Sequence, residues 1–242
     1  MAGLYFCPIY DCVFQGLEWG LSRPLRVRRE IVKASSEGRL LYASDIHLRP
    51  SNQKQIVSEL LQMVEREQPG TVLLGGDLVD QRSSLECLTE LVSSFGQTAR
   101  VAAVCGNHDR IVGYDRVREA VLAGGGVWLA DGAVRWGGIE LLERVEQYSG
   151  TGFAALCSHY PTDFTGALRK GIRLVLAGHL HGWQVVLWER GEYLYPGAWL
   201  SRWNGLRFER EASTLLVSRG VTDLFPLRWN CPREVILVEF SG

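Results

Sequence analysis

All five histidines of this 242-residue chain come shortly after apolar segments, at positions where they could act together on one ion or substrate. His47 comes after "LLYAS", His108 after "VAAVCG", His159 after "FAALCS", and His179 and His181 after "RLVLAG". Three oxygen-bearing side chains stand at equivalent positions: Asp45, Asp77 and Asn107. Packed or surface residues explain such a distribution poorly, so the set predicts a metal or acid–base site.

The spacing and residue types indicate which site. Asp45 and His47 are two residues apart, as are His179 and His181, so each pair projects from one face if the backbone is extended. Imidazole with carboxylate suits iron, manganese or zinc, and the lack of thiolate at these positions argues against structural zinc. Asp77 follows two glycines and is placed to bridge two ions. Two ions ~3.5–4 Å apart can hold a phosphate and generate a hydroxide at neutral pH.

The elements that must position these residues alternate as in α/β proteins. We expect strands at 39–44, 71–76 and 100–106, and helices at 53–66, 84–95 and 114–123. After three glycines, short strands at 127–130, 133–136 and 139–142 predict a meander, followed by strands at 153–158, 173–178, 184–189, 213–218 and 234–240. Ligands bind beyond the carboxyl ends of strands in open α/β sheets, so the polar residues should meet at one edge.

We find no repeat, low-complexity segment or linker in the chain. We therefore predict one α/β domain over residues 1–242, with two sheets in contact. Within it we expect a motif core at 40–184 and a β-rich C-terminal portion at 185–242.

The motifs also carry a family resemblance. In order they read "SDIH", "GGDLVD", "CGNHD", "CSHYP" and "AGHLHG", a set that resembles the calcineurin-like metallophosphoesterases over residues 40–184. The tail "LLVSRGVTDLFPLRWNCPREVILVEF" and the segment "LRVRREIVKASSEGRLLYASDIHL" are similar to the bacterial YkuE-like branch. The chain differs from that branch in having Trp183 where a glycine is common. The resemblance implies a four-layer α-β-β-α sandwich of two mixed sheets.

The resemblance also implies a role for each motif residue. Asp45, His47 and His181 would bind a first metal ion, Asn107, His159 and His179 a second, and Asp77 would bridge them. The ions would be divalent, with manganese expected and iron or zinc as alternatives. His108 would not bind metal but would act as general acid at the leaving oxygen or stabilise phosphoryl charge.

Several neighbouring residues have two interpretations. Asp109 would either orient His108 through its ring nitrogen or cap the helix at 114–123. Asp80 is expected to cap a helix or bond to backbone. Arg49, Arg82 and Arg110 would contact a substrate phosphate or lie on the surface. Trp183 and the aromatic stretch "YPGAWLSRW" would pack in the core or form an apolar lip for a lipid or nucleobase.

Composition narrows the class of protein. The chain is 46% hydrophobic and 22% charged with a formal net charge of -1, which is ordinary for a soluble globular protein and gives no support to specific nucleic-acid binding. The six cysteines form no CxxC pair, so we expect reduced thiols, with a local Cys7–Cys12 bridge as the alternative. The N-terminal "MAGLYFCPIYDCVFQ" lacks the features of a signal peptide, and no apolar run approaches the ~20 residues of a membrane span.

These observations predict a cytoplasmic enzyme, with peripheral membrane contact through the apolar N-terminus as an alternative to simple packing. The first hypothesis is a dimetal phosphohydrolase, a phosphodiesterase in particular, with a phosphate-ester substrate and no protein partner. The runner-up is a lipid-linked pyrophosphatase such as a UDP-diacylglucosamine hydrolase of lipid A synthesis. A non-catalytic metal-binding scaffold is a further alternative, ranked lower because every metal ligand of the family is retained. A nuclease is also ranked lower, because no basic stripe accompanies the site.

Overall fold

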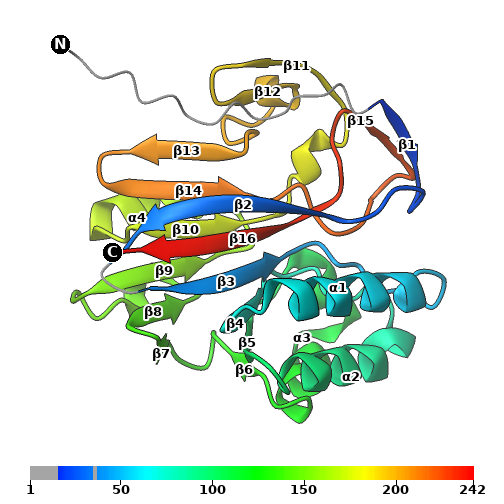
Figure 1. The fold of residues 1–242 in the computed structure, drawn as a ribbon, viewed down its shortest axis with the longest axis horizontal. Helices are drawn as coiled ribbons and strands as arrows, with labels where there is room; N and C mark the ends of the chain where they lie inside the picture. The colour runs from blue at the N-terminus through cyan, green and yellow to red at the C-terminus, as the bar shows by residue number, and fades with distance from the viewer. Residues whose placement is uncertain (1–15, 35–36) are drawn as a thin grey trace.

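The computed structural model describes residues 16–34 and 37–242, and Figure 1 shows their arrangement. Cys7 and Cys12, for which a local bridge was the alternative to reduced thiols, and the apolar N-terminal segment lie outside the described residues. Two six-stranded sheets form the centre of the molecule. In the part of the chain described, no helix is long and apolar enough to cross a bilayer.

The first sheet is mixed and carries three helices on its outer face (Figure 1). Its strands, in spatial order, are β2 (Arg26–Lys33), β16 (Glu234–Ser241), β3 (Gly38–Ala43), β4 (Thr71–Leu74), β5 (Arg100–Ala103) and β6 (Val127–Trp128). The helices are α1 (Gln53–Glu67), α2 (Leu85–Phe95) and α3 (Asn107–Ala123). Strands β3, β4 and β5 are parallel, so their carboxyl ends meet at one edge.

The second sheet is also mixed and has a thinner outer layer. Its order is β13 (Arg207–Arg210), β14 (Ser213–Val217), β10 (Leu174–Ala177), β9 (Phe153–Cys157), β8 (Ile139–Leu142) and β7 (Val134–Trp136). The helix α4 (Phe164–Lys170) packs on its outer face through Phe164 and Ala167, together with Trp203. Here β8, β9, β10 and β14 run parallel to one another.

Alternating side chains of β3 fill two separate cores. Leu41 and Ala43 belong to the core under the helices, whereas Leu40 and Tyr42 belong to the core between the sheets. Because successive side chains of a strand point to opposite faces, a sheet covered on both sides requires the continuous apolar run seen here. The layers are therefore α1–α3, first sheet, second sheet and α4, which confirms the predicted four-layer α-β-β-α sandwich.

Some local expectations were wrong. The predicted meander is divided between the sheets, because β6 pairs with β5 of the first sheet while β7 and β8 pair in the second. The helix expected at 114–123 begins at Asn107, directly after the third strand. Five strands were not foreseen: β1 (Leu17–Trp19), β2, β12 (Tyr193–Pro196), β13 and β15 (Leu227–Trp229). β2 is charged at five of its eight positions and lies at the edge of its sheet.

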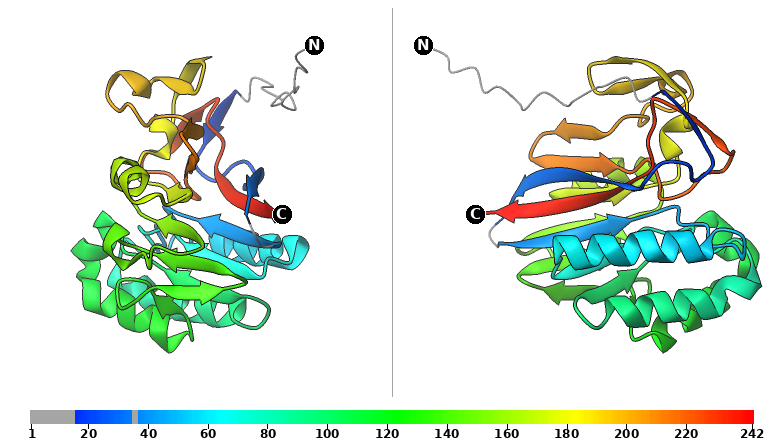
Figure 2. Two further views of the ribbon diagram at one scale, coloured as in Figure 1. Left: turned by 90° about the vertical axis from the view of Figure 1, so that its left-hand side faces the viewer. Right: turned by 45° about the vertical axis from the view of Figure 1, so that its right-hand side comes forward.

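Two small ribbons complete the fold. β1 (Leu17–Trp19) pairs antiparallel with β15 (Leu227–Trp229), and β11 (Val186–Arg190) pairs antiparallel with β12 (Tyr193–Pro196). The β11–β12 hairpin and the three helices of the first sheet lie at opposite ends of the molecule (Figure 2). A bridge between Val185 and Trp229 joins the two ribbons.

Candidate metal centre

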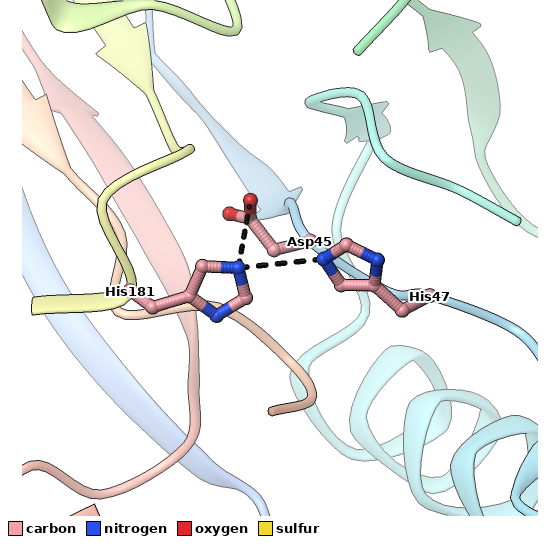
Figure 3. A group of neighbouring side chains, drawn as sticks. All are labelled: Asp45, His47 and His181. Atoms are coloured by element: carbon pink, nitrogen blue, oxygen red, sulfur yellow. Dashed lines mark hydrogen bonds and ion pairs between the residues drawn. The ribbon is translucent and has the colours of Figure 1, made fainter. Parts of the chain in front are cut away.

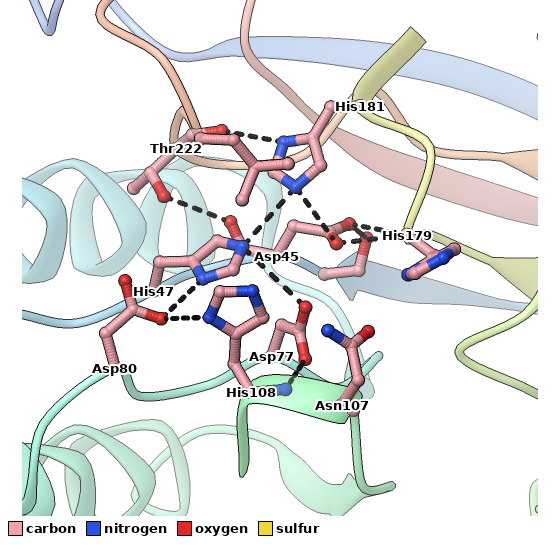
Figure 4. A network of polar contacts seen from close by, with 12 residues as sticks. Asp45, His47, Asp77, Asp80, Asn107, His108, His179, His181 and Thr222 are labelled. Carbon is pink, nitrogen blue, oxygen red and sulfur yellow. Dashed lines mark hydrogen bonds and ion pairs between the residues drawn. The ribbon is translucent and has the colours of Figure 1, made fainter. Parts of the chain in front are cut away.

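Five strands deliver the predicted ligands to one place. β3, β4 and β5 of the first sheet are followed by Asp45, Asp77 and Asn107, and β9 and β10 of the second by His159 and His179. The two sheets pack face to face, so ligands from both reach the same edge (Figure 4). We call this group the centre. Its members are Asp45, His47, Asp77, Asn107, His159, His179 and His181.

Asp45, His47 and His181 form a buried group at one side of the centre (Figure 3). The Nε2 atom of His181 lies 3.4 Å from Oδ1 of Asp45 and 3.3 Å from Nε2 of His47. The three side chains come from two motifs 134 residues apart. Their ligand atoms lie within 4.8 Å of one another, which is the arrangement of a metal-binding triad.

Asp77 lies between that group and a second one. Its Oδ2 is 3.8 Å from Nε2 of His47 and 3.3 Å from Nε2 of His159. His159 Nε2 is also 3.1 Å from Oδ1 of Asn107, and the rings of His159 and His179 meet edge to face at 5.1 Å. Asp77, His159 and His179 offer atoms within 4.8 Å of one another. A carboxylate shared by both groups has the position needed to bridge two ions.

Hydrogen bonds on the far side of each ring show that the centre fits cations. Nδ1 of His47 donates to Asp80 Oδ1 at 2.7 Å, and Nδ1 of His181 donates to the Thr222 carbonyl at 3.1 Å. Because each neutral ring then carries its proton on Nδ1, the two Nε2 atoms direct lone pairs at each other. His159 is alike, with Nδ1 bonded to the Gly75 carbonyl and Nε2 facing oxygen acceptors. The lone pairs of these Nε2 atoms and of the nearby oxygens repel one another unless a proton or a metal ion lies between them.

The acidity of the centre reflects the same need for positive charge. Burial alone would raise the pKa of Asp77, but His159 and His47 outweigh it and lower the pKa to about 2. Burial opposes the charged form of His159 too, yet Asp77 and Asp45 raise its pKa to about 9. Burial dominates at His181 and lowers its pKa to about 4. Without metal the carboxylates are ionised and protons are held where ions would bind, so metal and protons compete.

The backbone at the ligands is not extended, contrary to the expectation from their spacing. Asp45, His47, Asp77, His179 and His181 all have positive φ, between 44° and 70°. Such angles are uncommon outside glycine and cluster at functional sites. The paired ligands therefore reach one site by left-handed turns beyond the strand ends and not by strand alternation.

Two glycines allow the backbone to approach the ligands. A β-carbon on Gly106 would overlap the Asp77 carboxylate, and one on Gly178 would overlap Asp45 and Ser44. Ser44 in turn donates to Asp45 Oδ2 at 2.6 Å. The glycines of "CGNHD" and "AGHLHG" are therefore required by close packing against the carboxylates.

The structure corrects the predicted partner of His108. Nδ1 of His108 lies 2.9 Å from Asp80 Oδ1, the same oxygen that accepts from His47. Asp109 does not contact the His108 ring. It accepts backbone N–H groups from Leu78 and Gly106, each at 2.8 Å, because it is the third residue of α3 and closes the first turn.

Asp80 therefore belongs to the site, whereas the sequence analysis expected it to cap a helix or bond to backbone. Its Oδ2 accepts from Arg49 Nε at 2.5 Å, so Arg49 reaches the centre indirectly. Burial opposes its charge, but His47 and Arg49 hold the pKa of Asp80 well below its ordinary value. An ionised carboxylate is therefore fixed behind both His47 and His108.

The other predicted substrate residues lie outside these contacts. Arg82 donates to the Val112 carbonyl at 3.3 Å, and the exposed Arg110 lies over the Tyr114 ring at 5.7 Å. Trp183 is 45% exposed and packs against Gly197, where no β-carbon would fit.

Residues of the tail also support the centre, which the motif analysis missed. Thr222 accepts from His181 through its carbonyl and donates its N–H to the Asp45 carbonyl at 3.0 Å. Arg228, fully buried, donates to the same Thr222 carbonyl at 2.7 Å. Outside the tail, Tyr160 of the motif "CSHYP" meets the rings of His159 and His179 edge to face, at 5.1 and 4.7 Å. "LLVSRGVTD" marked the family branch but gave no sign of this contact.

Comparison with known proteins decides the family. The sequence pattern of the calcineurin-like phosphoesterases matches residues 38–183. The chain belongs to the calcineurin-like phosphoesterase family. It is accordingly a metal-dependent phosphoesterase, a hydrolase of phosphate esters, in a family that uses two metal ions.

Two relatives match over most of their own length at low sequence identity. An uncharacterised metallophosphoesterase of Aquifex aeolicus is 27% identical over 246 residues, covering 89% of this phosphoesterase and 90% of the relative. Phosphodiesterase YaeI of Escherichia coli is 26% identical over 223 residues, covering 83% and 81%. Among solved structures, TT1561 of Thermus thermophilus has a TM-score of 0.49 at 9% identity, covering 76% of this chain and 90% of the other.

Proposed function

We propose that this phosphoesterase is a dimetal phosphodiesterase of the bacterial YkuE-like branch, formed by one domain. The observation that carries the proposal is Asp77, which lies between two groups of ligand atoms, 3.8 Å from His47 and 3.3 Å from His159. One ion would be held by Asp45, His47 and His181, and the other by Asn107, His159 and His179, with Asp77 shared. The proposed ions are manganese, with iron or zinc as alternatives, since the ligands are imidazoles and oxygens.

Two bound ions would polarise the phosphoryl group and supply a nucleophile at neutral pH. His108 is assigned to the leaving group, because its side chain is 31% exposed whereas His47 and His181 are at most 2% exposed. His108 lies near His47 and Asp77, so its ring borders the position of the substrate phosphate. Asp80 accepts a hydrogen bond from Nδ1 of His108 and orients the ring, so that Nε2 would face the departing oxygen and donate a proton to it.

The phosphodiester preference is supported by the likeness to phosphodiesterase YaeI. To test it, the manganese-loaded protein is assayed on bis-p-nitrophenyl phosphate, p-nitrophenyl phosphate and a nucleotide pyrophosphate. We expect the diester to be cleaved with the highest kcat/KM, and Asp77→Asn to abolish this activity. Cleavage of the monoester or the pyrophosphate alone would exclude a phosphodiesterase while leaving the metal centre intact.

A lipid-linked pyrophosphatase, such as a UDP-diacylglucosamine hydrolase, is the second candidate. Large apolar side chains exposed near the centre favour it, with Phe225 at 72% and Trp183 at 45%. In this proposal the substrate joins a nucleotide to a lipid and the enzyme works in the cytoplasm at a membrane. Cys87, Cys105, Cys157 and Cys231 are unpaired, which agrees with a reducing compartment. Detergent-dependent hydrolysis of a nucleotide–lipid pyrophosphate, faster than that of any soluble diester, would favour this candidate.

A further inference from the structure

The β1–β15 ribbon has its apolar side chains on the outside. Leu17 stands opposite Trp229, and Trp19 opposite Leu227, so all four project from one face. We call these four residues the ribbon face; their exposures are 53, 40, 66 and 37%, respectively. The intervening pair, Glu18 and Arg228, is on the other face and is buried at 3% and 0%. A ribbon packed on a domain ordinarily shows the opposite pattern, with apolar side chains inside.

The buried polar pair fixes this orientation. Arg228 donates to Asp223 and to the carbonyls of Arg219, Thr222 and Cys231. A one-residue slip would turn Arg228 to solvent, lose these bonds and bury the ribbon face instead. The outward apolar face is therefore a built feature of the native fold.

The turn that leads into β15 extends the apolar surface. Leu224 and Phe225 are 44% and 72% exposed. The side chain of Gln184 holds this turn rigidly: its amide nitrogen donates to the carbonyls of Phe225 and Leu227, and its oxygen accepts from the N–H groups of Leu224 and Phe225. Gln184 is itself 4% exposed, so it serves the turn and not a solvent contact.

The buried side of the ribbon is linked to the candidate metal centre, and an apolar stretch of sequence precedes β1. Thr222, which accepts from both His181 and Arg228, lies five residues before Leu227. On the other strand, β1 begins at Leu17. Residues 1–15 precede it in the sequence, and they read "MAGLYFCPIYDCVFQ", which is mostly apolar and aromatic. The ribbon is therefore linked to the centre through Thr222, whose carbonyl bonds both Arg228 of β15 and His181, and β1 and β15 lie at one end of the molecule (Figure 1).

We propose that the ribbon face docks on the surface of a lipid bilayer and holds the centre at the level of the phosphate groups. Tryptophans flanked by leucine and phenylalanine on a protruding edge are the residues that settle at the boundary of headgroups and acyl chains. A protein interface ordinarily places its aromatic side chains in a flat, packed middle, whereas here they project from a ribbon and a turn tip. The docking goes beyond the proposed function, because it does not depend on which ester is cleaved.

Vesicle flotation of the full chain tests the proposal. The probes are vesicles of phosphatidylcholine alone and of phosphatidylcholine mixed with phosphatidylglycerol. We expect the wild type to float with vesicles, and the double variant Trp19→Ser, Trp229→Ser to partition about tenfold or more weakly. Ile31→Ser is the matched control, since Ile31 is 63% exposed on β2, outside the ribbon face, and should leave flotation unchanged.

Thermal unfolding first establishes that the double variant is folded; if it is not, Phe225→Ser replaces it and should weaken flotation in the same direction. Wild-type protein that floats with neither vesicle overturns the proposal, as does a double variant that floats like the wild type. So does a wild-type dimer that Trp19→Ser dissociates, because a second copy would then cover the face. Diester hydrolysis is measured separately on soluble substrate without vesicles. Its absence from a protein that floats would refute only the proposed function.

Discussion

Two buried polar clusters of this phosphoesterase balance their charge in different ways. The centre gathers carboxylates and imidazoles whose free atoms face one another, such as the two Nε2 atoms of His47 and His181 at 3.3 Å. The second, which we call the tail cluster, pairs each cation with anions or carbonyls. Its members are Arg28, Glu30, Asp223, Arg228, Arg233 and Glu234.

The difference shows which cluster is built to receive ions. In the tail cluster, Arg28 lies 3.1 Å from Glu30 and 3.2 Å from Glu234 and donates to two carbonyls besides. Among the described residues, no arginine bonds a member of the centre directly: Arg49 reaches only Asp80, behind His47, and Arg228 reaches only the Thr222 carbonyl, behind His181. Burying unpaired carboxylates is costly, so the positive charge that arginines do not supply must come from protons on the histidines or from bound cations.

Substitution of Asp77 should give the largest difference in effect between the centre and the tail cluster. We expect Asp77→Asn to lower kcat/KM on a soluble diester about a thousandfold or more, equivalent to ~4 kcal/mol, because both ions lose their shared carboxylate. Bound manganese, measured by elemental analysis, should fall below that of the wild type. Asp131→Asn is the control, since Asp131 is an exposed partner of Arg118, and should change neither quantity. An unchanged rate in Asp77→Asn would refute a bridging role.

The metal-free forms sharpen this comparison. Without ions, Asp77→Asn should unfold at a lower temperature than the wild type near neutral pH, because the protonated His159 loses the carboxylate that partners it. The loss should be larger with manganese bound, because the ions then lose their shared ligand as well. An equal loss with and without manganese would instead class Asp77 with the tail cluster.

Glu234→Gln should have the opposite signature: a loss of stability that metal does not alter. Burial opposes ionisation of Glu234, but Arg219 and Arg28 lower its pKa below the ordinary 4.5. The carboxylate therefore contributes stability above about pH 4.5 and loses it as the pH falls through the lower folded-state pKa. We expect Glu234→Gln to cost about 3 kcal/mol in urea unfolding near neutral pH.

The same measurement at decreasing pH gives the decisive trend. The gap between wild type and Glu234→Gln should narrow below pH 4.5, because the wild type protonates and comes to resemble the variant. A gap that widens on acidification would mean that the carboxyl is protonated in the native state.

Asp80→Asn tests the shell of the centre. Losing the charge behind His47 and His108 should lower kcat/KM about a hundredfold, near 2.7 kcal/mol, with a smaller loss of stability. Asp109→Asn is the matched variant, one motif away: it accepts only backbone N–H groups and should lower stability by about 1–3 kcal/mol with less effect on rate. If Asp109→Asn lowered kcat/KM more than Asp80→Asn, the result would support the sequence-based hypothesis that Asp109 orients His108.

Apolar periodicity predicted most of the first sheet and its helices. The run "RLLYAS" indicated β3, because a strand covered on both faces must be apolar throughout. The ligands could be assigned to one edge for the same reason, as they follow parallel strands. β2 was missed because five of the eight residues in "RVRREIVK" are charged, which is typical of an exposed segment. In the fold these charges have partners distant in sequence, such as Glu234 for Arg28 and Glu67 for Arg29.

Details set by distant contacts were not predictable. Asp80 looks like a helix cap in sequence, and only the fold brings it to His47 and His108, which lie 33 and 28 residues away. The left-handed backbone at Asp45 and His181 depends on bonds to Thr222, which belongs to the tail. Propensity rules describe neighbours in sequence, whereas these contacts join segments separated by up to 177 residues.

Arg228 belongs to the tail cluster and also touches the shell of the centre, so it should show the smallest and most mixed effect. Its guanidinium bonds Asp223 and the Thr222 carbonyl that fixes His181. Arg228→Lys keeps the charge but not the planar fork, so Thr222 should lose its second donor and His181 its fixed orientation. We expect manganese affinity to fall about tenfold, near 1.4 kcal/mol, with the loss confined to ligands of the first group. Isothermal titration with manganese should therefore show one weakened and one unchanged site. Equal weakening of both sites would indicate a general loosening of the fold, and the centre and the tail cluster would then be one structural unit.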